Sequence, residues 1–353
     1  MDVTIETGPA PTPAPARRAD AAPFRRPRLP AQLVAPSFPL ALAVVGTSVG
    51  VFVAGGVLAT WASGAALPLA LRVVLVAAGV LVAAHGAHLC GFVGHEGIHL
   101  NLHPNRWVSV VLGTFVSAMT SFSAIGYGIA HWNHHRFTNQ GSDPDAQLYA
   151  PLRTFWSRFL RARVNGNRSH QRNMIRMALG KPLALGYKLP FSARAQRRLA
   201  WMNVAMLALW LATYAAIAVV APRFVIFGVV LPILVLVPMS GLRGYLEHAG
   251  TRVGPFRDTR SYAAPFYTAL FLGNNFHLEH HLYPGVPCYR LPAVHRFLRA
   301  EGWFAHWQSP IETTVWGALR HTTAASQYPD AKAPDSADDP FLATARERVS
   351  AAA

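Results

Sequence analysis

Four long apolar segments constrain the fold of this chain more than any other feature of its sequence. An α-helix needs about 20 apolar residues to cross the hydrocarbon core of a bilayer. Only residues 63–65 separate the first two segments, and only residues 222–223 separate the last two. The sequence therefore predicts an all-α membrane protein with four transmembrane helices in two hairpins. The four segments are residues 38–62, 66–90, 199–221 and 224–241.

The charge balance agrees with a membrane protein. Charged residues make up 14% of the chain, against roughly 25% in soluble domains. The formal net charge of +16 is typical of some nucleic-acid-binding proteins, but here the basic residues flank the apolar segments. Most of them lie in residues 1–37 and 100–198. By the positive-inside rule, both termini and the segment between the hairpins are cytoplasmic, and we expect no nucleic-acid partner.

The two ends of the chain differ in composition from its centre. Residues 1–37 are rich in Pro, Ala and Arg, which predicts a disordered basic arm. Residues 323–353 are rich in Ala, Asp and Pro, which predicts a disordered tail. Residues 38–322 then form the membrane domain.

Histidine is the unusual residue type, because eight of the 16 histidines fall into three short clusters. Within each cluster the first histidine is followed by another three or four positions later, so on a helix they share one face. With an ordinary pKa near 6.5, imidazole is mostly neutral at pH 7 and can bind a metal. Eight such ligands exceed the needs of one ion and predict two ions, but imidazole suits Zn, Cu, Fe and Ni alike. The clusters are His95 and His99; His131, His134 and His135; and His277, His280 and His281.

A fifth apolar segment, residues 107–130, is long enough to span a membrane but is rich in Gly, Ser and Thr. If it crossed, the first and second clusters would lie on opposite faces, about 30 Å apart. We therefore interpret it as re-entrant or interfacial. The three clusters then form a cytoplasmic, histidine-rich helical cap.

Two other classes of metal protein, zinc proteases and metal transporters, also use clustered histidines. His95-Glu96-Gly-Ile-His99 matches the H-E-x-x-H pattern of zinc proteases, in which the glutamate is the general base. That interpretation leaves the six histidines of the other two clusters unexplained. A metal transporter normally places its ligands midway across the bilayer, whereas these clusters follow the ends of apolar segments.

The sequence resembles the membrane fatty acid desaturase superfamily over roughly residues 38–310. The three clusters match the three histidine boxes of that family in order and spacing. The flanking residues also match, in His134-His135-Arg-Phe-Thr-Asn139 leading to Asp143-Pro-Asp145 and in Asn274-Asn-Phe-His277 leading to Pro284. The segment from Arg243 to Thr251 is similar to the one that supplies an additional ligand, here His248.

This resemblance implies a di-iron centre that uses O2 as co-substrate and is held by the eight clustered histidines and His248. It implies an oxygen-dependent desaturase of long acyl chains in lipid metabolism, which removes hydrogen from an unactivated methylene. No fused haem domain is visible, so the electrons would come from a separate ferredoxin or cytochrome. Hydroxylases and carotenoid ketolases share the box pattern, so hydroxylation or ketolation of a lipid or carotenoid remains an alternative.

Six residues near the boxes are candidates for supporting roles. His88 lies on the same helical face as His95, about 10 Å deeper, and is expected to line a substrate tunnel, to orient a ligand, or to bond a neighbouring helix. The others are expected to orient histidine rings, unless they are solvated surface residues. They are Asp143, Asp145, Glu247, Glu279 and Asn274.

Overall fold

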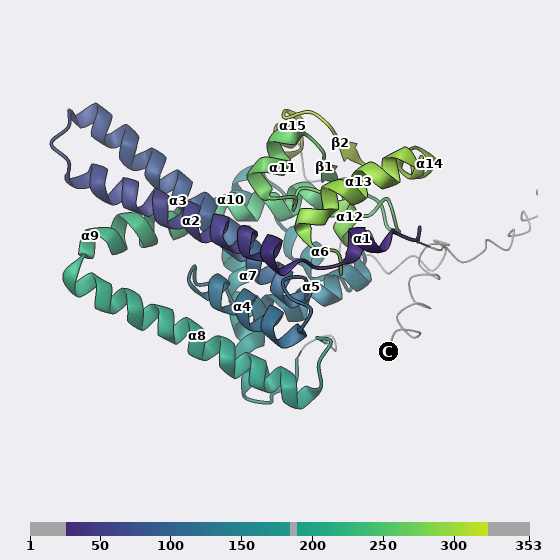
Figure 1. Ribbon diagram of the computed structural model, residues 1–353, viewed down its shortest axis with the longest axis horizontal. Helices are drawn as coiled ribbons and strands as arrows, with labels where there is room; N and C mark the ends of the chain where they lie inside the picture. The colour runs from purple at the N-terminus through teal and green to yellow at the C-terminus, as the bar shows by residue number, and fades with distance from the viewer. Residues whose placement is uncertain (1–25, 184–188, 324–353) are drawn as a thin grey trace, which may run out of the picture.

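The computed structural model describes residues 26–183 and 189–323, and these are mostly helical (Figure 1). The elements of the first half are α1 (Ala31–Val34), α2 (Phe38–Gly64), α3 (Leu69–Ile98), α4 (Arg106–Ala118), α5 (Ala124–Phe137), α6 (Pro144–Tyr149) and α7 (Phe155–Ala178). The second half begins with α8 (Ala193–Val220), α9 (Pro222–Phe224), the π-helical η2 (Val225–Val230) and α10 (Leu231–His248). It ends with β1 (Ser261–Tyr262), α11 (Pro265–Phe271), α12 (His277–Leu282), η3 (Cys288–Arg290), α13 (Leu291–Ala300), α14 (Trp303–Trp307), β2 (Ile311–Glu312) and α15 (Gly317–Thr323).

Within the described residues, four helical stretches are long and apolar enough to cross a membrane, as the sequence predicted. They are α2 with the short α1 before it, α3, α8, and the continuous run from α9 to α10. Three of these helices are longer than the apolar segments, because each continues into a stretch that contains polar residues. Helix α3 continues from residue 90 to Ile98, α8 starts at Ala193, and α10 continues to His248. These extensions carry His95 and His248.

The fifth apolar segment does not form one long helix. It is divided between α4 and α5 by a break at residues 119–123, where Ser121 has a φ of 60°. The 13 residues of α4 and 14 residues of α5 give lengths of about 20 Å, which is too short for the roughly 30 Å hydrocarbon layer. The chain therefore does not cross a membrane here as a single straight helix.

Helices α2 and α3 lie in close contact along their length because glycines face the interface. A Cβ atom added to Gly55 would overlap the backbone of Ala83, and one added to Gly86 would overlap the backbone of Phe52. Small residues allow this approach between helices that have no hydrophobic driving force in lipid.

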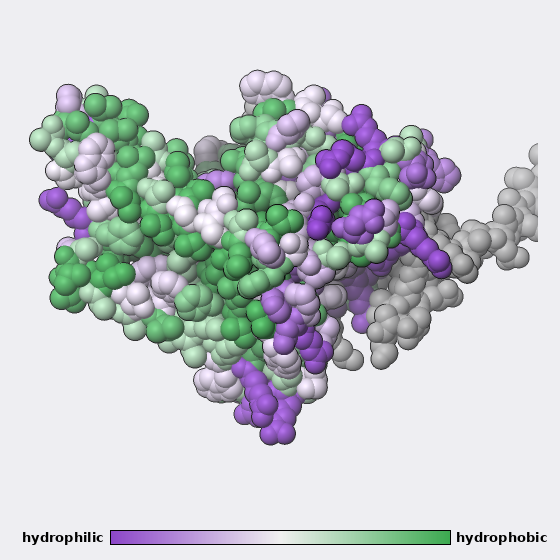
Figure 2. Space-filling view, in the orientation of Figure 1, coloured by the Kyte–Doolittle hydropathy of each residue, from purple (hydrophilic) through white to green (hydrophobic). Residues whose placement is uncertain are grey.

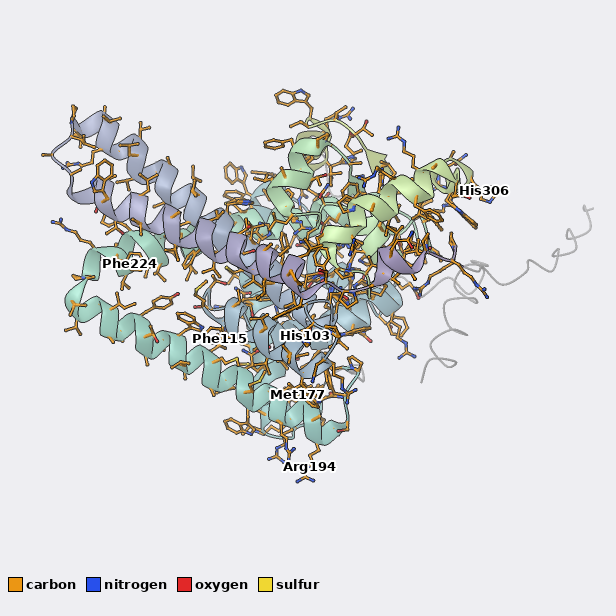
Figure 3. All side chains as sticks on the ribbon, viewed as in Figure 1. His103, Phe115, Met177, Arg194, Phe224 and His306 are labelled. Atoms are coloured by element: carbon orange, nitrogen blue, oxygen red, sulfur yellow. The ribbon has the colours of Figure 1, made fainter. Side chains whose placement is uncertain are left out.

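The links between α2 and α3 and between α8 and α9 lie at the same end of the molecule, since Gly64 packs beside the guanidinium of Arg223. In Figure 3, Phe224 marks this end, whereas Arg194 lies at the opposite end of α8. Figure 2 shows hydrophobic residues over the long helices and hydrophilic residues mainly away from these links. Elements β1 to α15 lie at the hydrophilic end, where β1 and β2 form a short parallel pair.

Residues 26–37, which the sequence analysis assigned to a disordered arm, are placed against the segment after α12. The Arg26 Nη1 donates a hydrogen bond to the Leu282 carbonyl at 2.6 Å, and the Tyr283 hydroxyl donates to the Pro27 carbonyl at 2.8 Å. These bonds link the segment to residues about 250 positions later in the chain, which the local composition could not indicate. Residues 1–25 and, of the predicted tail at residues 323–353, residues 324–353 lie outside the described residues.

The glycine contact between α2 and α3 predicts a position-specific loss of stability. We expect Gly55→Ala to lower the free energy of unfolding by about 1–3 kcal/mol, because the added methyl group forces the two backbones apart. Gly50→Ala on the same helix is the matched control, since no atom lies within 4 Å of its Cβ position. Thermal unfolding of both variants in one detergent measures the difference, and equal midpoints would contradict the contact.

Candidate metal centre

The nine histidines expected as ligands gather into two groups. Within each group, one ligand atom per residue lies within 4.8 Å of all the others. The first histidine group is His95, His99, His131, His135 and His280. The second histidine group is His134, His248, His277 and His281.

Four helices supply these side chains from distant parts of the sequence. His95 and His99 come from the end of α3, and His248 is the last residue of α10. The adjacent pairs on α5 and α12 each divide between the two groups, because neighbouring helical residues point about 100° apart. The expectation that the histidines of each cluster share one helix face is therefore wrong for the second and third boxes. Each of these boxes contributes to both groups.

Within each group the Nε2 atoms point toward one another. In the first histidine group, the Nε2 of His135 lies 3.0 Å from the Nε2 atoms of both His131 and His280. In the second, the distance from His248 Nε2 to His277 Nε2 is 3.1 Å, and that from His134 Nε2 to His281 Nε2 is 3.3 Å. Convergent nitrogen atoms at this spacing surround a common point in each group.

Burial keeps most of these rings neutral. It lowers the pKa of His99, His131 and His280 well below the ordinary value, and the neighbouring histidines lower it further. A neutral imidazole carries one lone pair that needs a donor or a metal. Both nitrogens of His99, and the Nδ1 atoms of His135 and His280, are buried without a hydrogen-bond partner. All three residues belong to the first histidine group, where unpartnered nitrogens among converging rings fit a bound metal ion.

His134 differs from the others because carboxylates surround its outer nitrogen. Burial lowers the pKa of His134, but Asp143 and Asp145 outweigh this effect and raise it to about 9. The Nδ1 atom donates to Asp143 at 2.8 Å and lies 3.9 Å from Asp145. The two carboxylates thus favour the protonated ring when no metal is bound. Because Asp143 holds the proton on Nδ1, a bound metal ion would replace the proton on Nε2, which faces the second histidine group. Asp143 thus has the orienting contact expected from the sequence, and Asp145 lies farther away.

Four further contacts hold outer nitrogens and were missed by the sequence analysis. In one of them, His95 Nδ1 lies 3.3 Å from Glu96 Oε1. The Tyr127 hydroxyl lies 2.8 Å from His131 Nδ1, and Thr138 Oγ1 lies 3.3 Å from His281 Nδ1. His248 Nδ1 lies 3.2 Å from the carbonyl oxygen of Asp258. Tyr127 precedes His131 by four residues, so helical spacing could have identified it. The carbonyl of Asp258 has no sequence signal, since every residue carries that group.

The acidic residues near the third box make different contacts. Glu247 lies 3.6 Å from His277 Nε2 and forms an ion pair with Arg243 at 2.7 Å. Glu279 bonds His295 on α13 and Ser261 on β1, both at 2.5 Å, so it joins these elements to α12 instead of orienting a box histidine. The histidine ring that Glu279 contacts is therefore His295, which lies outside the three boxes.

Asn274 makes no bond to a box histidine either. Its carbonyl accepts a hydrogen bond from Arg243 Nη2 at 2.6 Å, and its side-chain nitrogen donates to the Phe271 carbonyl at 3.1 Å. The residue therefore holds the chain just before α12 and fixes the guanidinium of Arg243.

Glu96 is not placed as the general base of a zinc protease. Only 1% of its surface is exposed. Its Oε2 atom accepts hydrogen bonds from the Cys288 backbone at 2.8 Å and from Asn101 Nδ2 at 3.4 Å. The carboxylate therefore connects the end of α3 to the segment after α12.

A cavity lies beside both histidine groups. Six of the nine histidines line it, and α3 also contributes His88 and Phe92 to its lining. The His88 ring lies 4.6 Å from that of Phe92 and belongs to neither group. This position agrees with the expectation that His88 borders a space next to the metal ligands. The six are His95, His131, His134, His248, His277 and His280.

The contact between His134 and Asp143 predicts a loss of metal affinity on substitution. We expect Asp143→Asn to weaken metal binding by about 10- to 100-fold, because the outer carboxylate fixes the ring and raises its basicity. Asp145→Asn should have a smaller effect, since that carboxylate lies 3.9 Å away. Competition with a chelator, followed by metal analysis, measures both. Equal affinity of Asp143→Asn and the parent protein would show that Asp143 does not act on the ring.

The comparisons with known proteins agree with this geometry. No curated protein matches the chain significantly. The model of one family, described as fatty acid desaturase, matches residues 71–308, which is more than half of the chain and contains all nine histidines. The chain belongs to the fatty acid desaturase family.

Proposed function

We propose that this protein is an oxygen-dependent acyl-chain desaturase whose two histidine groups each bind one iron ion. The observation that carries the proposal is the pair of adjacent groups, of five and four histidines, whose inner nitrogens converge. Family membership supports iron as the metal, since imidazole ligands alone do not select it.

With iron bound in both groups, the centre would reduce O2 and couple this reduction to the removal of hydrogen from an unactivated methylene. The protein's own residues orient the ligands and shape the space for the substrate. Tyr127 bonds His131 and stacks on its ring at 4.6 Å, while Asp143 fixes His134. Phe92 and Leu236 provide apolar contacts in the cavity beside these rings. A chain lying in that cavity would present its methylenes to both groups, and a separate ferredoxin or cytochrome would deliver the electrons.

The same centre could insert oxygen instead of forming a double bond. Chromatography of lipids from cells with and without the gene distinguishes the two reactions. Loss of two vicinal hydrogens gives an alkene and supports desaturation. A hydroxyl or keto product would replace this proposal with the hydroxylase or ketolase alternative.

Substitution of one histidine from each group tests the ligand assignment. We expect two iron ions per chain in the parent protein, one for each histidine group. His134→Ala and His280→Ala should each lower iron content and abolish product, since each removes a direct ligand from a different group. His88→Ala is the control, because it should retain iron and change only turnover or chain-length preference. Metal analysis and product profiles on the same preparations measure both effects.

Three results would contradict these assignments. Stoichiometric zinc with activity independent of oxygen would overturn the di-iron proposal. Iron loss in His88→Ala as complete as in His280→Ala would make His88 a ligand. If His88→Ala changed neither iron nor product, the residue would have only a packing role.

We further propose that α2 with α3 and α8 with α10 form two membrane hairpins, with both termini and the histidine groups in the cytoplasm. The support is the charge distribution. The two helix links lie together at one end, where Arg223 is their only charged residue. The basic α7 follows the second histidine box, and Lys and Arg concentrate on the cytoplasmic side of membrane proteins.

Cysteine labelling tests this topology. In intact cells, Ala66→Cys and Pro222→Cys should react with an impermeant reagent, whereas Asn105→Cys and Gln147→Cys should react only after permeabilisation. The native Cys90 and Cys288 give a low background because both are buried. External labelling at residue 147 together with internal labelling at residue 105 would refute a shared cytoplasmic face.

A further inference from the structure

Two polar side chains of α7 face the cavity beside the histidine groups. Arg163 and His170 line this cavity together with Gly166, and the spacing of three and four residues places all three on one helix face. Helix α7 is held close to the second box, because a Cβ atom on Gly126 of α5 would overlap the His170 carbonyl. Arg163 and His170 therefore have a fixed position relative to His131.

The charges around the cavity leave Arg163 without an ionic partner. Glu247 pairs with Arg243 at 2.7 Å, and Asp145 lies 3.9 Å from His134. Both of these cavity-lining carboxylates thus have a basic neighbour. Within residues 26–183 and 189–323, no carboxylate forms an ion pair with Arg163, whose guanidinium lies 4.8 Å from the centre of the Phe122 ring.

The other polar groups near Arg163 are neutral. Burial raises the pKa of Tyr127 and of Tyr149 well above the usual range, so both phenols stay protonated. Burial, with a smaller effect from Arg163, lowers the pKa of His170 to about 3. The His170 Nδ1 atom is buried and has no hydrogen-bond partner. The wall formed by α7 therefore offers one unpaired positive charge and one unused ring nitrogen.

We propose that Arg163 binds an oxyanion head group of the substrate, a carboxylate or a phosphate, and that His170 donates a hydrogen bond to the same group. The planar guanidinium presents paired N–H donors that match these oxyanions. Arg163 is partly buried. Partial removal of its charge from water without an ionic partner is costly, and a bound oxyanion offsets that cost.

The proposal specifies the substrate class of the desaturase proposed above and rests on that function. The head group lies in the same cavity as the metal ligands, so the carbon that loses hydrogen is close to the head group along the chain. A substrate whose head group stays outside the protein would not use Arg163.

Ligand-dependent thermal stability of the full chain in detergent tests the proposal without turnover. The probes are dodecanoate, dodecyl phosphate and neutral dodecanol at equal mole fractions in the micelle. Because a ligand at free concentration L stabilises the folded state by RT ln(1 + L/Kd), titrations give an apparent Kd for each probe. We expect at least one anion to bind about tenfold more tightly than dodecanol, since its charged hydrogen bonds add that much affinity. Preference for dodecanoate or for dodecyl phosphate identifies the head group.

Variants assign the preference to Arg163. Arg163→Gln should remove it and Arg163→Lys should keep part of it. Arg161→Gln, at an exposed position on the same helix, should leave it intact. Equal affinity of the parent protein for all three probes overturns the proposal whatever the variants do, and so does a preference that persists in Arg163→Gln. Metal analysis of the same samples distinguishes failure of the head-group proposal from failure of the desaturase proposal. Zinc in place of iron would refute the desaturase proposal but not the binding of an oxyanion by Arg163.

Discussion

The structure depends on the packing of nine imidazoles, six of them buried and three partly buried, in one small volume. Protonated rings at this spacing would repel one another and lose their hydration, so burial holds most of them neutral. Neutral rings then direct lone pairs at each other, and several of their nitrogens have no hydrogen-bond partner. Without metal, such a cluster is costly to fold. The stability of this region is therefore expected to depend on the ions that it binds, as in other sites where ligands are distant in sequence.

The arrangement of the helices follows from the need to bring these rings together. Helices α3 and α10 extend beyond their apolar segments and end at the two histidine groups. The break between α4 and α5 brings the chain back toward the end of α3, so that His131 lies beside His99 in the first histidine group. Glu96 and Glu279 then link α3 and α12 to the later segments by buried hydrogen bonds. The long helices and the histidine groups thus form one connected structure.

Much of this arrangement could be predicted from the sequence because its signals are local. Apolar length indicated the four long helices, and histidine spacing indicated eight of the nine members of the two groups. The ninth, His248, was expected only from the resemblance of residues 243–251 to a segment of the desaturase family. His134 and His135 belong to different histidine groups because of the way α5 faces α12. The spacing of the histidines in the sequence does not define that orientation. The contacts of Glu279 with His295 and of Arg26 with Leu282 join distant parts of the chain. Neither the composition nor the periodicity around these residues contains that information.

The central claim is that two neighbouring and unequal histidine groups each hold one iron ion. Mössbauer spectroscopy of the iron-loaded protein tests it most directly, because each iron environment gives its own quadrupole doublet. The claim predicts two environments of equal area, corresponding to the groups of five and four histidines. A single mononuclear iron environment, accounting for one ion per chain, would contradict it.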